Sequence, residues 1–123
     1  MDNIILASED LDPGDFVNIY DNGGIANARK ADASAANADK VAQGFVRVAT
    51  AAGSHATVYF KGTNDRLVGL TPGLTYALSH SIPGAVIELG TATTTAGESL
   101  QVLGVAVTAT TLYAEIDQPI IRG

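Results

Sequence analysis

Two closely spaced Pro-Gly pairs constrain the fold of this chain more than any other feature of its sequence. Pro72-Gly73 and Pro83-Gly84 lie on either side of the short run TYALS, residues 75–79. Proline fixes φ at a value that suits a turn, and glycine permits positive φ, so each pair predicts a reversal of the chain. The run between the two pairs predicts a short strand.

Alternation of apolar and polar residues predicts strands in most of the remaining chain. DFVNIY (15–20) alternates in this way, DNGG (21–24) supplies a hairpin-type turn, and IANARKA (25–31) is the return strand. GFVRVAT (44–50) and HATVYFKG (55–62) show the same alternation. Roughly eight or nine short strands at such spacing favour a β-sandwich or a small β-barrel.

The C-terminal part of the chain predicts a second hairpin. SLQVLGVAV (99–107) is apolar on both faces, which indicates a strand buried on both sides. TLYAEI (111–116) alternates and predicts a half-exposed partner strand, which the short link TAT (108–110) joins to the first. Before this hairpin, AVIEL (85–89) predicts another strand and GTATTTAGE (90–98) predicts a loop.

Small residues make up much of the chain, which has 20 Ala, 12 Thr and 13 Gly but no Trp and only 3 Phe. Large apolar side chains are therefore scarce, and the predicted core is thin. We expect part of the stability to come from burial between subunits or against a partner. A chain of 123 residues is most simply one domain.

Charge and the absence of cysteine exclude several classes of function. Thirteen acidic and seven basic residues give a net charge of −6, which opposes electrostatic binding to nucleic acid or to an anionic membrane. Without cysteine there is no disulfide, thiolate metal site or cysteine nucleophile. No apolar run approaches the length of a membrane span, and the N-terminus lacks the pattern of a signal peptide. We therefore expect a soluble protein that is synthesised in the cytoplasm.

The alanine-rich segment ADASAANADKVAQ, residues 31–43, leaves two structures open. It can form a short helix that Asp32 or Ser34 caps at its N-terminus and that Gly44 ends. The alternative is a loose loop of small residues.

The N-terminal residues 1–14 are predicted to form an arm that is separate from a single β domain of residues 15–123. The arm begins with the apolar run Ile4–Leu6, becomes acidic, and breaks at Pro13-Gly14. Two placements of the arm are open. It can pair with an edge strand of its own domain, or it can add a strand to the sheet of a partner, where backbone hydrogen bonds supply the affinity.

Residues that could bind a metal ion form no recognisable motif. His55 and His80 stand alone at predicted strand edges, without the further ligands that a zinc site needs, and we interpret them as surface histidines. The acidic residues near the N-terminus do not follow the order of a calcium-binding loop, so a solvated acidic turn is favoured over a calcium site. These acidic residues are Glu9, Asp10, Asp12 and Asp15.

Motifs for catalysis and for nucleic-acid binding are also missing from the sequence. It has no Gly-x-Ser-x-Gly elbow, and its glycine-containing runs do not precede a helix as a phosphate-binding loop must. Arg47, Lys61 and Arg66 form no basic patch with interleaved aromatic residues. We expect no enzymatic activity, no cofactor and no bound metal.

The order of several longer motifs resembles that of small virion structural proteins of tailed bacteriophages, above all the head decoration (cement) proteins. The motifs are L.PGDFVNIY, ARKADAS, A.GFV, G..ATVYFKGTN..L.GLTPG..Y.LS...PG and QVLG.AV.AT.LYAEID.PI, which together span nearly the whole chain. The block GLTPG..Y.LS...PG also resembles modules of phage tail and fibre proteins. No catalytic motif accompanies the resemblance.

The resemblance implies an all-β protein with a compact small barrel or sandwich of the β-tulip kind, an extended N-terminal arm and at most one short helix. It implies a homotrimer that binds the major capsid protein on the outer capsid surface of the virion, after synthesis in the cytoplasm of the bacterial host. Its function there would be to reinforce the shell against the pressure of the packaged DNA.

In such decoration proteins an N-terminal arm can add a strand to the sheet of the capsid subunit. By this resemblance, the capsid-binding arm of the present chain would consist of Asn3, Ile4, Ile5, Leu6, Ala7 and Ser8. The acidic run that follows the arm would meet basic groups on the capsid.

The alternative is a tail, fibre or spike module that binds a receptor or a carbohydrate. Such a module needs an exposed aromatic or polar platform, for which the candidates are Tyr59, Tyr76 and Tyr113. All three tyrosines also suit the packing of neighbouring strands.

Overall fold

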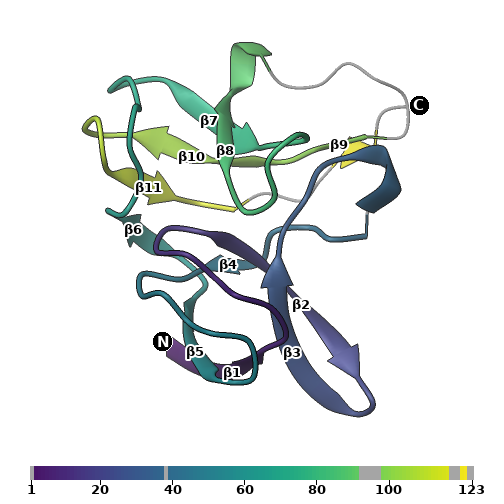
Figure 1. Cartoon of the computed structure of the whole chain (residues 1–123). Helices are drawn as coiled ribbons and strands as arrows, with labels where there is room; N and C mark the ends of the chain where they lie inside the picture. The colour runs from purple at the N-terminus through teal and green to yellow at the C-terminus, as the bar shows by residue number, and fades with distance from the viewer. Residues whose placement is uncertain (1, 38, 92–97, 117–119, 122–123) are drawn as a thin grey trace.

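The computed structural model describes residues 2–37, 39–91, 98–116 and 120–121, and these residues are organised almost entirely by β-strands (Figure 1). Five strands close into a small barrel, and five others form an open sheet beside it. Within the described residues, the helical pieces are two 3-10 turns, η1 (Ala35–Asn37) and η2 (Leu89–Thr91), and neither could cross a membrane. The predicted all-β fold with a small barrel is confirmed.

The barrel is formed by strands from the first half of the chain. In order around the barrel these are β1 (Asp2–Ala7), β3 (Ile25–Lys30), β2 (Phe16–Asn22), β4 (Gly44–Phe45) and β5 (His55–Tyr59). β1 runs parallel to β3 and antiparallel to β5, whereas the other neighbouring pairs are antiparallel. The N-terminal strand therefore closes the barrel.

The open sheet is formed by the second half of the chain and lies above the barrel in Figure 1. Its strands, in order, are β6 (Gly62–Asn64), β11 (Leu112–Ala114), β10 (Val102–Ala106), β7 (Thr75–Leu78) and β8 (Val86–Glu88). A separate short pair joins β9 (Ser99–Leu100) to β12 (Ile120–Ile121). The predicted β10–β11 hairpin is confirmed, and the strands predicted on either side of Pro83-Gly84 pair with each other as β7 and β8.

The predicted hairpin of residues 15–31 is also confirmed. Asn22 of β2 pairs with Ile25 of β3, which leaves a loop of Gly23 and Gly24 alone. Both glycines have positive φ, 65° and 89°, as a two-residue hairpin turn of this kind requires. The carboxylate of Asp21 accepts a hydrogen bond of 2.8 Å from the Gly24 amide and so stabilises the turn.

Small residues fill the interior of the barrel. The buried cluster there consists of Ala7, Leu11, Val17, Ala28, Val46, Ala56 and Val58. The interior of a barrel widens with the number of its strands, so five strands leave room for few large side chains, of which Leu11 is one. Three alanines from β1, β3 and β5 are therefore suited to the positions that they occupy.

Larger side chains form a second core where the barrel meets the open sheet. Phe16 and Phe45 of the barrel, with ring centroids 5.7 Å apart, belong to one buried cluster with Leu78, Leu103 and Leu112 of the open sheet. This shared cluster joins the two halves of the described chain into one packed body.

The alanine-rich segment of residues 31–43 is a loop with one 3-10 turn, as far as it is described. The carboxylate of Asp32 accepts hydrogen bonds from the backbone amide of Ser34 (2.9 Å) and from the side-chain amide of Asn37 (3.1 Å). Asp32 thus caps a single turn, and no longer helix follows it in the described part of the segment.

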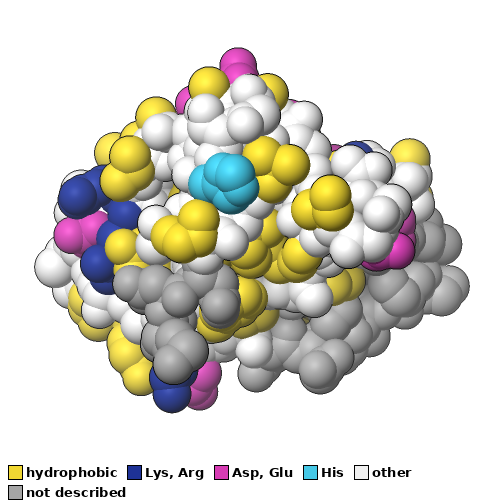
Figure 2. All heavy atoms as spheres, turned by 90° about the horizontal axis from the view of Figure 1, so that it is seen from below, with side chains coloured by type: hydrophobic (Ala, Val, Ile, Leu, Met, Phe, Trp, Pro, Cys, Tyr) yellow, Lys and Arg dark blue, Asp and Glu magenta, His cyan; other side chains and the backbone are white. Residues whose placement is uncertain are grey.

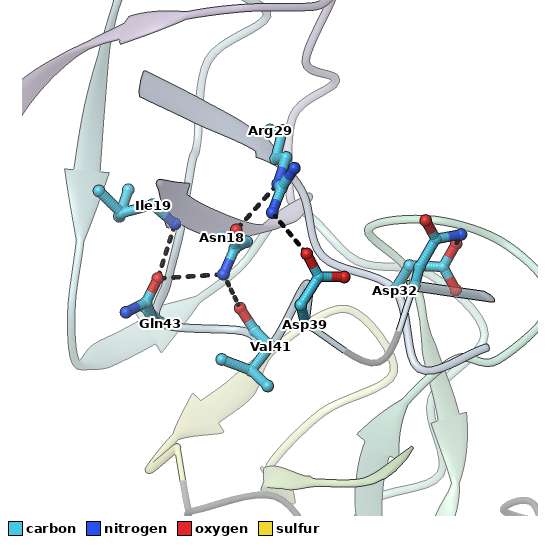
Figure 3. Close-up of polar contacts among 8 residues, drawn as sticks. Asn18, Ile19, Arg29, Asp32, Asp39, Val41 and Gln43 are labelled. Atoms are coloured by element: carbon cyan, nitrogen blue, oxygen red, sulfur yellow. Dashed lines mark hydrogen bonds and ion pairs between the residues drawn. The ribbon is translucent and has the colours of Figure 1, made fainter. Parts of the chain in front are cut away.

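Buried amide side chains hold the end of this segment against the rest of the protein. Figure 3 shows Asn18 of β2 at the centre of a polar network, where its Nδ2 donates to the carbonyl oxygen of Val41 (2.9 Å) and to Oε1 of Gln43 (3.2 Å). The Nε of Arg29 donates to Oδ1 of Asn18 at 2.9 Å. These contacts satisfy the polar backbone of a loop without the internal hydrogen bonds of a helix.

The buried side chain of Gln101 makes a similar connection from the open-sheet half of the chain. Its Oε1 accepts a hydrogen bond from the backbone amide of Ala42, and its Nε2 donates to the carbonyl oxygen of Ala42, both at 2.8 Å. One side chain thereby satisfies both polar backbone groups of a buried residue.

The predicted strand of residues 44–50 is wrong beyond Phe45. Val46 lies outside the strand, and its amide donates to the carbonyl oxygen of Asp15 while its carbonyl oxygen accepts from the amide of Gly14. Thr50 then forms an isolated bridge with Leu11. Backbone hydrogen bonds to the segment that precedes β2 therefore override the alternating pattern.

The prediction that residues 99–107 form one strand buried on both sides is also wrong. The stretch divides into β9 and β10, and the pairing of β10 with β7 shifts between Val102 and Gly104. Leu103 and Ala106 are buried, but Val105 and Val107 are 42% and 55% exposed. One apolar face of β10 therefore lies on the surface of the single chain.

We expect Gly104→Ala to destabilise the protein, because a Cβ at this position would lie 2.1 Å from the carbonyl oxygen of Tyr113. The expected loss in the free energy of unfolding exceeds about 2 kcal/mol, measured by urea denaturation. Gly53→Ala is the control, since Gly53 has positive φ but nothing within 4 Å of its added Cβ. Its expected loss is about 1 kcal/mol, and equal losses in the two variants would contradict the close approach at Gly104.

Candidate interaction surfaces

The predicted capsid-binding arm lies within the barrel. In the antiparallel register Asn3 pairs with Val58 and Ile4 with Thr57 of β5. On its other edge, Ala7 pairs with Ala28 of β3. β5 thus occupies one edge of β1, and β3 occupies the other edge at Leu6 and Ala7. The strand pairs within its own domain, which is the first of the two placements left open by the sequence.

The side chains of β1 alternate between the barrel interior and the surface. Ala7 is buried in the barrel core, and Ile5 packs against that core. Ile4 is 65% exposed, Leu6 is half-buried and Ser8 is exposed. The part of the predicted arm that a partner could contact is therefore Ile4, Leu6 and Ser8.

These side chains belong to a larger surface that we call the barrel face. It is defined by Ile4, Leu6, Val48, His55 and Thr57. Ile4 and Leu6 pair with Thr57 and His55 across the β1–β5 register, and Val48, which is 69% exposed, lies beside them in the loop after β4. Figure 2 views the protein from the barrel end and shows hydrophobic side chains gathered around a histidine, with charged side chains toward the edges. The barrel face thus combines exposed apolar groups with few charges.

A second apolar surface, the sheet face, lies on the outer side of the open sheet. It is defined by Thr75, Val102, Val105, Val107 and Tyr113. Val105 pairs with Thr75 on one side and with Tyr113 on the other, so these residues form a row across three strands. A shallow groove of about 210 Å³ runs beside this row.

The three candidate tyrosines differ in how much of each is available to a ligand. Tyr76 is buried, and its hydroxyl accepts a hydrogen bond of 2.8 Å from the amide of Thr71. Tyr59 is half-buried and packs against Phe45 with ring centroids 5.6 Å apart. Tyr113 is 52% exposed. Only Tyr113 of the three offers an open aromatic ring.

The acidic side chains near the N-terminus bind backbone groups of their own chain. Glu9 accepts a hydrogen bond from the amide of Lys30, and Asp10 accepts one from the amide of Ala52, at 2.8 and 2.9 Å. Asp15 accepts one of 2.8 Å from the amide of Asp12. These carboxylates therefore stabilise the entry into β2. Within the described residues, no group of three or more potential ligands could hold a metal ion.

Asp15 and Lys30 form a partly buried pair at this entry, with 3.7 Å between the Lys30 Nζ and the Asp15 Oδ2. Burial raises the pKa of Asp15, although the hydrogen bond from Asp12 and the charge of Lys30 act in the opposite direction. Burial lowers the pKa of Lys30, but the charges of Asp15 and Asp12 outweigh it and raise the pKa. Both pKa values are therefore raised, that of Asp15 by burial and that of Lys30 by the neighbouring carboxylates.

The histidines lie where the sequence placed them, at a strand end and a turn. His55 is exposed at the start of β5, and His80 is half-buried in the connection between β7 and β8. The Nδ1 atom of His80 is buried without a partner among the described residues.

Sequence reasoning missed the environment of Arg47. The guanidinium of Arg47 lies over the ring of Tyr59, with 4.6 Å from Cζ to the ring centroid, and the Nε of Arg66 donates to the carbonyl oxygen of Arg47 at 3.3 Å. Arg47 lies in the loop after Phe45, within the stretch 44–50 that the alternating pattern predicts as a strand. No pattern in the sequence could therefore have placed Arg47 beside a groove.

Comparison with known proteins identifies no relative, since no protein-family model, curated protein or solved structure matches the chain. The barrel face and the sheet face are therefore the features from which a function can be argued.

We expect Ile4→Asp and Ala7→Asp to differ strongly in stability. Ile4 points to solvent, so the loss in the free energy of unfolding should be about 1 kcal/mol or less. Ala7 is 1% exposed, so a carboxylate there should cost about 3 kcal/mol or more. Urea denaturation of both variants measures the difference. Similar losses would show that β1 does not alternate between the two environments.

We also expect Asp15→Asn to change how stability depends on pH. The pKa of Asp15 is raised above its ordinary value of 3.8, so the folded chain takes up a proton at higher pH than the unfolded chain. The free energy of unfolding of the natural chain, minus that of Asp15→Asn, should therefore increase as the pH falls from about 7 to about 4. Urea denaturation at both pH values tests this. A decrease in the difference would show that folding lowers the pKa of Asp15 rather than raising it.

Proposed function

We propose that this protein is a non-enzymatic structural protein of a bacteriophage virion, which binds the outer surface of the capsid and stabilises the shell. The observation that carries this proposal is the exposure of large apolar side chains on two separate faces. Ile4 and Val48 lie on the barrel face, and Val105 and Tyr113 lie on the sheet face. Exposed apolar surface of this kind typically marks a site of protein–protein contact.

The proportions of the core support a role in an assembly. Alanine and valine occupy most of the barrel interior, while several of the larger aliphatic side chains remain exposed. Burial of one such side chain contributes roughly 1.5–3 kcal/mol, so a partner that covers a few of them adds substantially to stability. A decoration protein gains this burial when it binds the shell.

The barrel face is the surface that we assign to the major capsid protein. β5 pairs with one edge of β1 and β3 pairs with the other at Leu6 and Ala7, so we assign the capsid contact to the outward side chains of Ile4 and Leu6 and to Ser8, which follows the strand. At Leu6 and Ala7, addition of β1 to a capsid sheet would first require its release from β3 or β5. The sheet face is then free for contact between copies, as the homotrimer implied by the resemblance would need.

A tail, fibre or spike module that binds a receptor or carbohydrate is the second candidate. One observation favours it, because the exposed ring of Tyr113 lies beside a groove that Glu115 and Thr75 also line. An aromatic ring with neighbouring hydrogen-bonding groups is a platform on which a sugar can stack.

The number of copies in purified particles tests the proposal. Quantitative mass spectrometry should find this protein near parity with the major capsid protein. A few copies per particle would favour the tail or fibre module instead. Absence from particles would overturn both candidates.

We expect Ile4→Asp to weaken binding to particles that lack the protein, because it places a charge on the barrel face. Val68→Asp is the matched control, since Val68 is 82% exposed and lies outside both faces. Cosedimentation with particles measures the bound fraction of each variant. Equal binding by the two variants would exclude the barrel face as the capsid contact.

A further inference from the structure

A groove next to the barrel face is lined by hydrogen-bond donors and by no described carboxylate. It has a volume of about 320 Å³ and lies between β5 and the loop that follows β4. Its polar lining consists of Arg47, Thr50, Ser54, His55, Thr57 and Tyr59. In a chain with 13 acidic residues and a net charge of −6, a groove with this lining is a local exception.

Arg47 is the charged group of the groove, and its position is fixed by the surrounding structure. Its Cζ lies 4.6 Å from the ring centroid of Tyr59 and 6.0 Å from that of Phe45, and its Nη2 donates to the carbonyl oxygen of Thr63. These contacts leave other N–H groups of the guanidinium without a partner in the described part of the chain. A guanidinium that is held in place binds a carboxylate at a lower cost in conformational entropy.

Further donors on the groove wall are also available to a ligand. The hydroxyl groups of Ser54 and Thr57 and the imidazole of His55 make no hydrogen bond within the described residues. Thr50 differs, because its hydroxyl already donates to the carbonyl oxygen of Val48 at 3.2 Å. A bound carboxylate could therefore accept hydrogen bonds from two chemically different kinds of donor.

Apolar side chains lie beside these donors. Ile4 pairs with Thr57 across the β1–β5 register, and Val48 lines the opposite side of the groove. A ligand that places a carboxylate near Arg47 would therefore bring adjoining atoms onto exposed apolar surface. A long polyanion fits less well, because the net charge of the whole chain repels it.

We infer that this groove binds an acidic peptide segment, with a carboxylate at Arg47 and an apolar side chain against Ile4 and Val48. The inference adds to the proposed function the chemistry of the capsid segment that contacts the barrel face. It rests on the proposed function for the identity of the partner. It is tested on the isolated chain, without particles.

The test is an NMR titration of the ¹⁵N-labelled full chain with the peptide acetyl-Asp-Leu-Glu-Leu-amide. The neutral peptide acetyl-Asn-Leu-Gln-Leu-amide is the control for the carboxylates. We expect the acidic peptide to shift the amide signals of residues 46–59 and the neutral peptide to leave them nearly unchanged. Equal binding of the two peptides, or shifts confined to other parts of the chain, would overturn the inference.

Two variants assign the binding to the groove. Arg47→Gln should weaken the acidic peptide about tenfold, the loss of roughly one charge-assisted hydrogen bond. Lys61→Gln removes the same charge from an exposed lysine that does not line the groove, and should leave the affinity unchanged. Equal weakening by both substitutions would mean that general charge attraction, not the groove, binds the peptide.

A third variant guards against an effect of Arg47 on folding, because this residue packs against Phe45 and Tyr59. Thr57→Glu keeps Arg47 and adds a carboxylate to the groove, so it should abolish binding while the spectrum remains that of a folded protein. Unchanged binding to this variant would overturn the inference.

Inorganic phosphate provides the last arm of the test. If phosphate shifts the same signals and the acidic peptide does not, the groove binds phosphate groups and the peptide inference is wrong. If the protein does not bind the acidic peptide but is present in particles in about the same number of copies as the major capsid protein, only this inference is overturned. Absence from particles overturns the proposed function but not the peptide chemistry of the groove.

Discussion

Closure of the barrel by β1 is the constraint on which the rest of this structure depends. The strand uses both of its edges, one against β3 and one against β5, and its inward residue Ala7 meets Ala28 and Ala56 in the barrel core. Larger side chains at these positions would force the five strands apart. The high alanine content is therefore a requirement of a narrow barrel, and the bulkier residues Phe16 and Phe45 lie instead where the barrel meets the open sheet.

This arrangement also explains why the surface carries so many apolar side chains. A narrow interior accepts few of them, so Ile4 and Val48 remain outside the barrel. Val105 on the outer side of β10 and Val107 just after that strand are also exposed. Such a chain folds with a small core and retains surfaces that a partner can cover. The proposed place on a capsid, where a partner would cover these surfaces, is consistent with a small core and an apolar surface. The Arg47 groove supplies a polar element within an otherwise apolar contact.

Local sequence signals predicted those parts of the fold that local interactions determine. The Gly23-Gly24 and Pro83-Gly84 turns lie in hairpins, and Pro72-Gly73 forms the turn before β7, because the backbone angles of these turns are set by the residues themselves. Prediction was wrong where distant groups decide, as at Val46, whose backbone pairs with Gly14 and Asp15. The outward side of β1 carries residues of the arm that the sequence predicted. The groove at Arg47 depends on the loop after Phe45, which the sequence pattern predicts as a strand, so the groove could not be predicted.

The position of β1 ahead of the other barrel strands in the sequence has a consequence for the order of folding. β1 leaves the ribosome well before its antiparallel partner β5, which ends only at Tyr59. Until then one edge of β1 has no strand to pair with, and the barrel stays open whatever else has formed. The pairs that close the barrel, such as Asp2 with Tyr59 and Leu6 with His55, join residues that are far apart in the sequence. Pairing of this kind is typical of slow steps in the folding of β proteins. Completion of the barrel is thus coupled to synthesis of the middle of the chain.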